Sequence, residues 1–162
     1  MLSSAILGYV LGLALIAGAQ TGAPSSIPNL SGTWRLDRDL TTADLSRVRT
    51  DILLVRQSFE EIRFDYYDRD RQRLGVETFI TDGDERPRYK TRIERAYARA
   101  RWKDDRLIVR TRSFLDHEGY QSYSLDEIWQ RSPDGTLLTN KSSDGKEMVY
   151  RRVDVREELF EP

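Results

Sequence analysis

The chain has 162 residues, a formal net charge of −1, no cysteine and a single histidine, His117. Without cysteine there are no disulfides, no thiol chemistry and no cysteine-ligated metal, and one histidine cannot form a multi-histidine metal site within one chain. About 140 residues remain if the apolar N-terminal segment, described next, is removed as a leader. This is the usual size of one domain.

The N-terminus carries an uncharged apolar run, Ala5–Ala19, that ends in the small residues Ala17-Gly18-Ala19. About 15 apolar residues are too few for a comfortable membrane span, which takes about 20. The run is typical of a secretory signal peptide, and its small residues suit cleavage. We therefore expect a signal peptide over 1–19, a flexible linker over 20–28, and a secreted or periplasmic protein without stable membrane insertion. A retained anchor is the alternative.

After the linker, strand patterns alternate with turn signals such as Asp82-Gly83 and Ser132-Pro133-Asp134-Gly135. The best helical candidate is Thr41–Val48, in which Leu45 and Val48 are expected to face inward. A loose tail is expected over 156–162. The predicted strands cover 31–37, 51–58, 60–67, 74–81, 92–102, 106–114, 120–131, 136–142 and 146–154.

About eight or nine consecutive strands with short connections predict an antiparallel meander, because parallel crossovers need a dozen or more residues. A meander of this size must close or leave two long edges exposed, and closure removes the edges. We therefore predict an all-β fold, an antiparallel up-and-down β-barrel of about eight to ten strands over 29–155. A two-sheet sandwich is the alternative architecture.

The alternation of side chains in two strands predicts which residues the barrel encloses. In 92–102 the long arginines belong outside, so the small residues on the other face point inward and leave room for a cavity or a packed element. The predicted inner row of this strand is Glu94, Ala96, Ala98, Ala100 and Trp102. The predicted inner row of 120–131 is Tyr123, Leu125, Glu127 and Trp129. A buried glutamate is costly unless it is paired or hydrated, so Glu127 is a candidate polar anchor.

Three motifs occur in order along the chain. The segment 29–37 contains Gly32-Thr33-Trp34, the segment 102–109 reads W-x-x-D-x-L-x-V, and the segment 129–139 contains W-x-x-S-P-D-G. Over about residues 30–154 this layout resembles a group of small secreted bacterial lipocalin-like proteins. The resemblance implies a calycin-type barrel that can hold a small apolar molecule. It also implies that Trp34 plugs the closed end and that Arg151 or Arg152 packs over it.

The most favoured function is non-catalytic binding of a small, largely apolar ligand, without a cofactor. Ala96, Ala98 and Ala100 are expected to form the floor of the pocket. The expected walls and polar handles are Trp102, Leu125, Trp129, Tyr123 and Glu127. The first alternative is a packed structural or interaction module of the cell envelope. The second is a weak hydrolase that pairs Glu127 with Glu77 or Glu94. The oligomeric state is left open.

The segment 86–112 holds nine arginines and two lysines against three acidic residues, a net charge of +8. Because these cations are interleaved with Ala, Tyr, Ile and Val, we interpret them as a solvated outer face beside acidic neighbours such as those of 60–67. Export also argues against a nucleic-acid partner. Inward carboxylates are expected to pair with Arg63, Arg110 or Arg112.

His117 lies in a predicted hairpin tip, Asp116-His117-Glu118-Gly119. A general base or a haem ligand is one interpretation, but an exposed turn residue is favoured because loop tips face solvent. Aspartates that could bind calcium lack the spacing of an EF-hand loop, so we interpret them as turn formers and outer-face charges. They are Asp65, Asp68, Asp70, Asp82 and Asp84. No metal site is expected.

Overall fold

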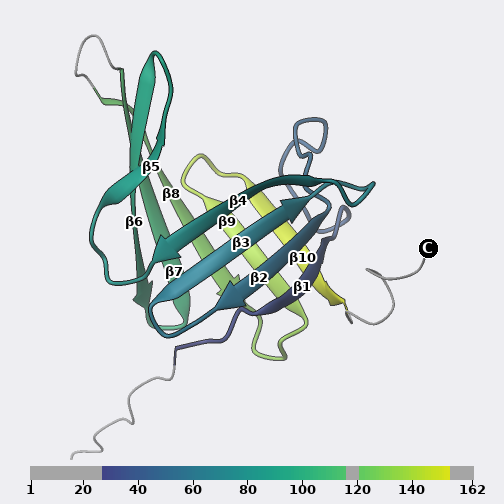
Figure 1. Ribbon diagram of the computed structural model, residues 1–162. Coiled ribbons are helices and arrows are strands. Elements are labelled where there is room, and N and C mark those ends of the chain that lie inside the picture. The colour runs from purple at the N-terminus through teal and green to yellow at the C-terminus, as the bar shows by residue number, and fades with distance from the viewer. Residues whose placement is uncertain (1–26, 116–120, 154–162) are drawn as a thin grey trace, which may run out of the picture.

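The structure is a computed structural model that describes residues 27–115 and 121–153. The expected signal peptide, most of the linker, the turn with His117 and the tail 156–162 lie outside the described residues. The described part is all-β, with ten antiparallel strands in one curled sheet (Figure 1). The strands are β1 (Gly32–Leu36), β2 (Ile52–Gln57), β3 (Glu61–Tyr67), β4 (Arg73–Ile80), β5 (Arg86–Lys90), β6 (Glu94–Lys103), β7 (Arg106–Leu115), β8 (Gln121–Arg131), β9 (Leu137–Ser142) and β10 (Glu147–Val153).

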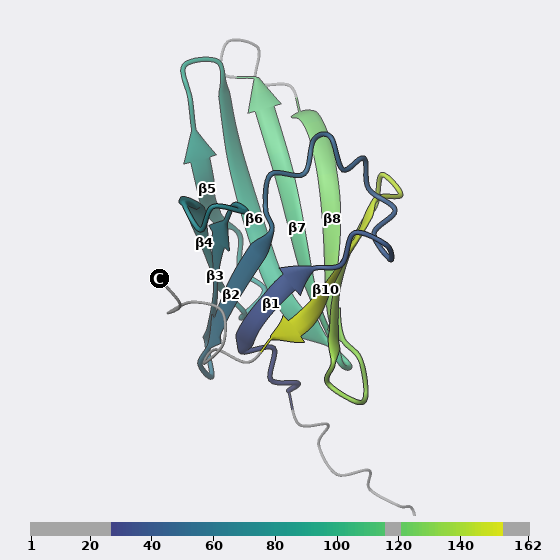
Figure 2. The same ribbon diagram turned by 90° about the vertical axis from the view of Figure 1, so that its right-hand side faces the viewer.

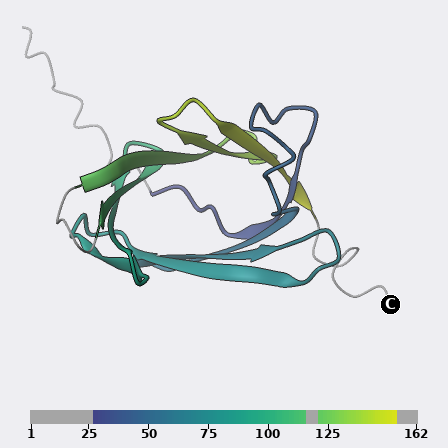
Figure 3. The same ribbon diagram turned by 90° about the horizontal axis from the view of Figure 1, so that it is seen from above.

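The sheet has the order β4-β3-β2-β1-β10-β9-β8-β7-β6-β5, so β1 pairs with β10 and the two ends of the sheet are β4 and β5. Seen from above, the strands follow a flattened ring (Figure 3). In the described residues no ladder joins β4 to β5. Instead, the turn between them reaches β6, where the Gly83 amide donates to the Ala100 carbonyl at 2.9 Å and Asp82 bridges Arg101.

The predicted meander in a single sheet is confirmed, but the ring of backbone hydrogen bonds is interrupted. The reason lies in β5, which is short and contains Pro87, a residue without an amide donor that is confined to edge strands and bulges. β5 pairs only with the first half of β6, and these strands extend beyond the rest of the sheet together with β7 and β8 (Figures 1 and 2).

Each of the nine predicted strands is observed, with its ends within two residues of the expected positions. β5 was not predicted, because Arg86–Lys90 has no apolar alternation. The predicted helix over Thr41–Val48 is wrong: this segment forms turns, with the Arg47 amide 3.0 Å from the Asp44 carbonyl. Leu45 and Val48 still pack against the core, as expected. No helix of the described ranges is long and apolar enough to cross a membrane.

Trp34 closes one end of the curled sheet. Its side chain is fully buried, and its Nε1 donates to the Leu30 carbonyl at 3.0 Å. The Arg152 guanidinium lies over the indole, 5.8 Å from the ring centroid. The strand enters through Gly32, whose φ of 151° is rare for residues with a side chain. Of the two candidate arginines, Arg152 therefore covers the tryptophan.

The outer face carries the basic segment. Arg99 and Arg101 are exposed, as expected, and Arg95 is half-buried. The acidic partners of Arg110 and Arg112 lie outside the strand 60–67: Arg110 binds Asp126 at 2.6 Å, and Arg112 binds Glu85 at 2.9 Å. Arg63 likewise binds Asp65, and Arg151 binds Asp37. The expected pairing of Arg63, Arg110 or Arg112 with inward carboxylates is therefore wrong, because these arginines meet carboxylates beside them on the outer face.

Candidate functional site

The inner rows of β6 and β8 are those that the sequence predicts. Ala96, Ala98 and Ala100 are 1%, 6% and 1% exposed. Ala98 and Ala100 join the core cluster together with Phe79 of β4. Their small side chains allow β4 to lie close to β6 where β5 does not intervene, which is how the sheet curls back on itself.

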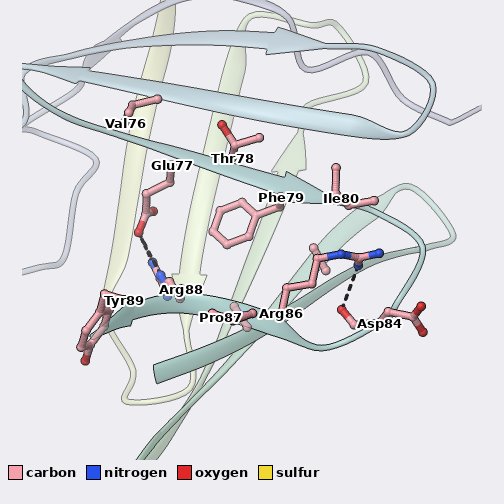
Figure 4. A pocket seen from close by; sticks show the side chains of 12 residues that line it. Val76, Glu77, Thr78, Phe79, Ile80, Asp84, Arg86, Pro87, Arg88 and Tyr89 are labelled. Atoms are coloured by element: carbon pink, nitrogen blue, oxygen red, sulfur yellow. Dashed lines mark hydrogen bonds and ion pairs between the residues drawn. The ribbon is translucent and has the colours of Figure 1, made fainter. Parts of the chain in front are cut away.

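A cleft of about 370 Å³ lies between the two end strands of the sheet (Figure 4). We call it the β4–β5 cleft. Residues 76–80 of β4 form one wall, and Asp84 with residues 86–89 form the other. Ala98 and Ala100 of β6 also line it. Its lining mixes apolar and charged side chains, so it is suited to a molecule that carries both.

Arg88 is the centre of a polar cluster inside the sheet. Its Nε lies 2.9 Å from Glu77 Oε1, its Nη1 lies 3.3 Å from Glu127 Oε2, and it also donates to Thr111. The ion pair with Glu77 spans the β4–β5 cleft (Figure 4). Only 17% of the Arg88 side chain is exposed. A guanidinium with five donors suits several acceptors at once.

Two further side chains complete this network, which we call the Arg88 cluster. The Tyr66 hydroxyl donates to Glu77 Oε2 at 2.9 Å, and Asn140 Nδ2 donates to Glu127 Oε1 at 3.4 Å. The cluster thus joins strands β3, β4, β5, β7, β8 and β9 across the interior. Its members are Tyr66, Glu77, Arg88, Thr111, Glu127 and Asn140.

Arg88 lies at a β-bulge in β5. Arg86 pairs with Ala98 and Tyr89 pairs with Ala96, so both of these β5 residues share the inner face with the alanines. The register shifts between Pro87 and Tyr89, which inserts Arg88 as an extra residue. Arg88 stays on the inner face with Arg86, two residues before it, and the bulge brings the next residue, Tyr89, to that face as well. The sequence analysis missed Arg88 because it did not predict β5, so it assigned no inner face to this segment.

Burial sets the electrostatics of the cluster. Burial raises the pKa of Glu127, Arg88 opposes this rise, and the nearby Glu77 carboxylate adds to it. Burial also raises the pKa of Tyr66 and Tyr150, and neighbouring carboxylates raise both further. Burial works against the charge of Arg88, but the two glutamates hold the pKa of its guanidinium above the ordinary value. One cation therefore serves two carboxylates.

A second cavity, of about 290 Å³, borders the cluster from the side of β8–β10. We call it the Glu127 cavity. Apolar side chains, Ala43, Val48, Leu125 and Met148, form much of its lining, and Glu127 and Asn140 lie among them. A broader groove that includes Tyr66 and Glu77 shares Val48 and Met148 with it. The turns over 41–48 therefore cover part of the candidate site.

The predicted pocket residues do not line one common cavity. Ala98 and Ala100 line the β4–β5 cleft, whereas Leu125 and Glu127 line the Glu127 cavity. Trp129 is a core residue, 2% exposed, with its ring centroid 4.6 Å from that of Phe64. The prediction of an inward, paired Glu127 is confirmed, but its cation is Arg88.

The remaining predicted residues lie at the margins. Trp102 lines a separate surface hollow beside Phe59, and Tyr123 is 44% exposed. The Tyr123 hydroxyl lies 3.2 Å from that of Tyr89. Ala96 is buried but lines neither the β4–β5 cleft nor the Glu127 cavity.

Sequence reasoning overlooked Arg88, Tyr66 and Asn140. The available signal was Pro87, which marks an edge or a bulge when it interrupts a strand. The candidate calcium ligands serve as outer-face and turn charges: Asp65 binds Arg63 and Arg73, and Asp82 binds Arg86. The described part of the chain contains no group of three or more potential metal ligands.

No protein-family model and no curated protein matches this chain. The function proposed below is therefore based on the geometry of the interior.

Proposed function

We propose that the protein is an exported, non-catalytic, lipocalin-like binding protein that takes a small, largely apolar ligand into the interior of its curled sheet. The observation that carries this proposal is that two cavities, of about 370 and 290 Å³, border one buried polar cluster. Pockets for small ligands are mostly apolar with a few fixed polar groups, and they begin at about 300 Å³.

The arrangement also favours a ligand site over a fully packed module. Val76 on the edge of β4 is 45% exposed and lines the β4–β5 cleft. The floor of this cleft is made of alanines, which fill little of the space between the end strands. The other end of the sheet is closed by Trp34 and Arg152, the arrangement that the lipocalin resemblance implies.

The carboxylates are better suited to anchoring than to hydrolysis. A glycosidase-type pair needs its two carboxyl groups to flank the substrate, at about 5 to 9.5 Å from each other. Here the Arg88 guanidinium binds both Glu77 and Glu127 and takes the place between them. The third carboxylate candidate, Glu94, is not part of the Arg88 cluster.

The proposal is tested by fluorescence titration with N-phenyl-naphthylamine, a neutral apolar dye that brightens on burial. We expect saturable binding to the wild type and a marked loss of it in Ala98→Leu, which fills the floor of the cleft. Ala96→Leu, two residues along the same inner row, is the matched control and should retain binding. Thermal unfolding of each variant checks that its fold is retained.

Absence of saturable binding to a folded wild type would overturn the proposal and favour the packed structural module. Full binding by a folded Ala98→Leu variant would show that the dye does not occupy the β4–β5 cleft.

A further inference from the structure

Glu127 lacks a cation of its own. Its only ion pair within the described residues is with Arg88, at 3.3 Å, and the same guanidinium lies closer to Glu77, with Nη2 2.5 Å from Oε1. The side chain of Glu127 is only 16% exposed. With both carboxylates ionised, the Arg88 cluster carries a net charge of −1 inside the sheet.

Asn140 adds an unsatisfied acceptor. Its Nδ2 donates to Glu127 Oε1 at a long 3.4 Å, and its Oδ1 is buried without a hydrogen-bond partner. The residue is 3% exposed and lines the Glu127 cavity. A buried acceptor without a donor destabilises the protein, because it has lost its hydrogen bonds to water. A ligand that brings donors to this point offsets that loss.

The other charges around the Glu127 cavity neutralise each other. Arg47 lies 3.4 Å from Asp44, and Lys146 pairs with Asp144. Glu127 is therefore the one charged lining residue of this cavity whose cation is shared with a nearer carboxylate. The apolar lining of Ala43, Val48, Leu125 and Met148 lies around it.

We propose that the ligand carries a protonated amine, and that this amine sits against Glu127 and Asn140 while the apolar body lies along the Glu127 cavity. This inference rests on the proposed function, because it names the head group of the ligand bound in the same interior. An ammonium has three donors and no acceptor, so it matches a carboxylate and an amide oxygen. It also brings the positive charge that the cluster lacks.

An anionic head group fits less well. It would have to bind Arg88, which already serves two glutamates, and it would add a second negative charge to a buried site. At short range in a poorly solvated interior, like charges repel each other strongly. A neutral hydroxyl can satisfy Asn140 but cannot offset the charge of Glu127.

The inference also predicts a pH dependence. Burial raises the pKa of Glu127, so the carboxylate ionises at a higher pH than an exposed glutamate does, and an ammonium should bind better once it has ionised. The charged and titratable groups around it are Arg88 on β5, Glu77 on β4, Tyr66 on β3 and Tyr150 on β10, with Asp44, Arg47, Asp144 and Lys146 at the cavity. Asp44 and Asp144 have lowered pKa values because Ser46 and Lys146 donate to them, so they remain ionised through this range.

The test compares three probes with the same chain, octylamine, octanol and octanoate, by isothermal titration calorimetry on the protein without its leader. We expect octylamine to bind at least about tenfold more tightly than octanol, a difference of about 1.4 kcal/mol, and octanoate to bind most weakly. The affinity of octylamine should rise as the pH is raised from about 4.5 to about 8, while that of octanol stays level.

Glu127→Gln keeps the shape of the side chain and should reduce the octylamine-to-octanol preference to about one. Glu61→Gln, on the outer face of β3, is the matched control and should keep the preference.

If octanol and octylamine bind equally, the amine inference is overturned and the proposed function stands. If octanoate binds best, the inference is overturned in favour of Arg88 as the anchor. If none of the probes binds, both proposals fail. If Glu127→Gln does not fold, the pH dependence of octylamine affinity in the wild type tests the inference instead, and an affinity that does not rise with pH overturns it.

Discussion

The Arg88 guanidinium on β5 and the Glu77 carboxylate on β4 join the two ends of the sheet, with Nε 2.9 Å from Oε1. Among the described residues no backbone ladder links these strands, so this ion pair and the turn between them hold the cleft together. Open edges ordinarily invite pairing with other chains, and proline and charged side chains discourage it. The same ion pair therefore secures the curl and lines the candidate site.

Replacing Arg88 by methionine should destabilise the protein by about 3 kcal/mol, because it leaves Glu77 and Glu127 inside the sheet without their cation. Urea unfolding measures the loss. Arg86→Met is the matched control on the same strand: Arg86 pairs with Asp82, and both are more than 40% exposed, so its loss of stability should be much smaller than that of Arg88→Met. Equal losses in the two variants would contradict a special role for Arg88.

The pH dependence of stability should distinguish Glu127 from Glu85. Burial raises the pKa of Glu127 above its ordinary 4.5, so its contribution to stability is present below that pH and is lost as the pH rises through the folded-state pKa. Glu127→Gln resembles the protonated residue. It should therefore become more stable relative to the wild type as the pH increases.

For Glu85 we expect a pH dependence of stability with the opposite sign. The Arg112 guanidinium lowers its pKa, so its contribution is present above the ordinary value and is lost as the pH falls. Glu85→Gln should therefore lose stability relative to the wild type as the pH increases. Urea unfolding of both variants and the wild type between about pH 4 and pH 8 measures the two slopes. Slopes of the same sign would show that burial does not set the direction of the pKa shift of Glu127.

Strand alternation was sufficient to predict the inner faces of β6 and β8, because side chains in a regular strand alternate between the two faces. The three alanines and Glu127 are on the predicted side for this reason. Gly32-Thr33-Trp34 likewise located the buried indole. In each case the relevant information is local to one strand.

The centre of the candidate site could not be predicted in the same way. Arg88 lies on the inner face of β5, a strand that was not predicted because Arg86–Lys90 has no apolar alternation. The partners of Arg88 come from β4, β7 and β8, which alternation does not place relative to one another. The gap between β4 and β5 is also a property of the whole sheet. Pro87 was a local sign of an edge, but it does not indicate which strand lies opposite.

The basic segment should not act as a binding surface for polyanions. Arg110 and Arg112 are paired with Asp126 and Glu85. The exposed cations of the segment are spread along it, at Lys90, Arg92, Arg99, Arg101 and Lys103. Retention on heparin should be weak and should disappear near physiological salt, where the screening length is about 8 Å. Retention at higher salt that is lost in Arg99→Ala/Arg101→Ala would contradict this interpretation.

Trp34→Ala should destabilise the protein by about 3–5 kcal/mol, the usual cost of removing a large aromatic side chain from a core. The indole is fully buried and donates to Leu30, and Arg152 covers its face, so the substitution removes packing, a hydrogen bond and a cation–π contact together. Urea unfolding measures the change. Ile93→Ala is the control, because Ile93 is 65% exposed and its loss should stay within about 0.5 kcal/mol. Arg152→Met tests the cover alone and should cost about 0.5–2 kcal/mol. A loss for Trp34→Ala as small as that of the control would mean that this end of the sheet is not held closed by the tryptophan.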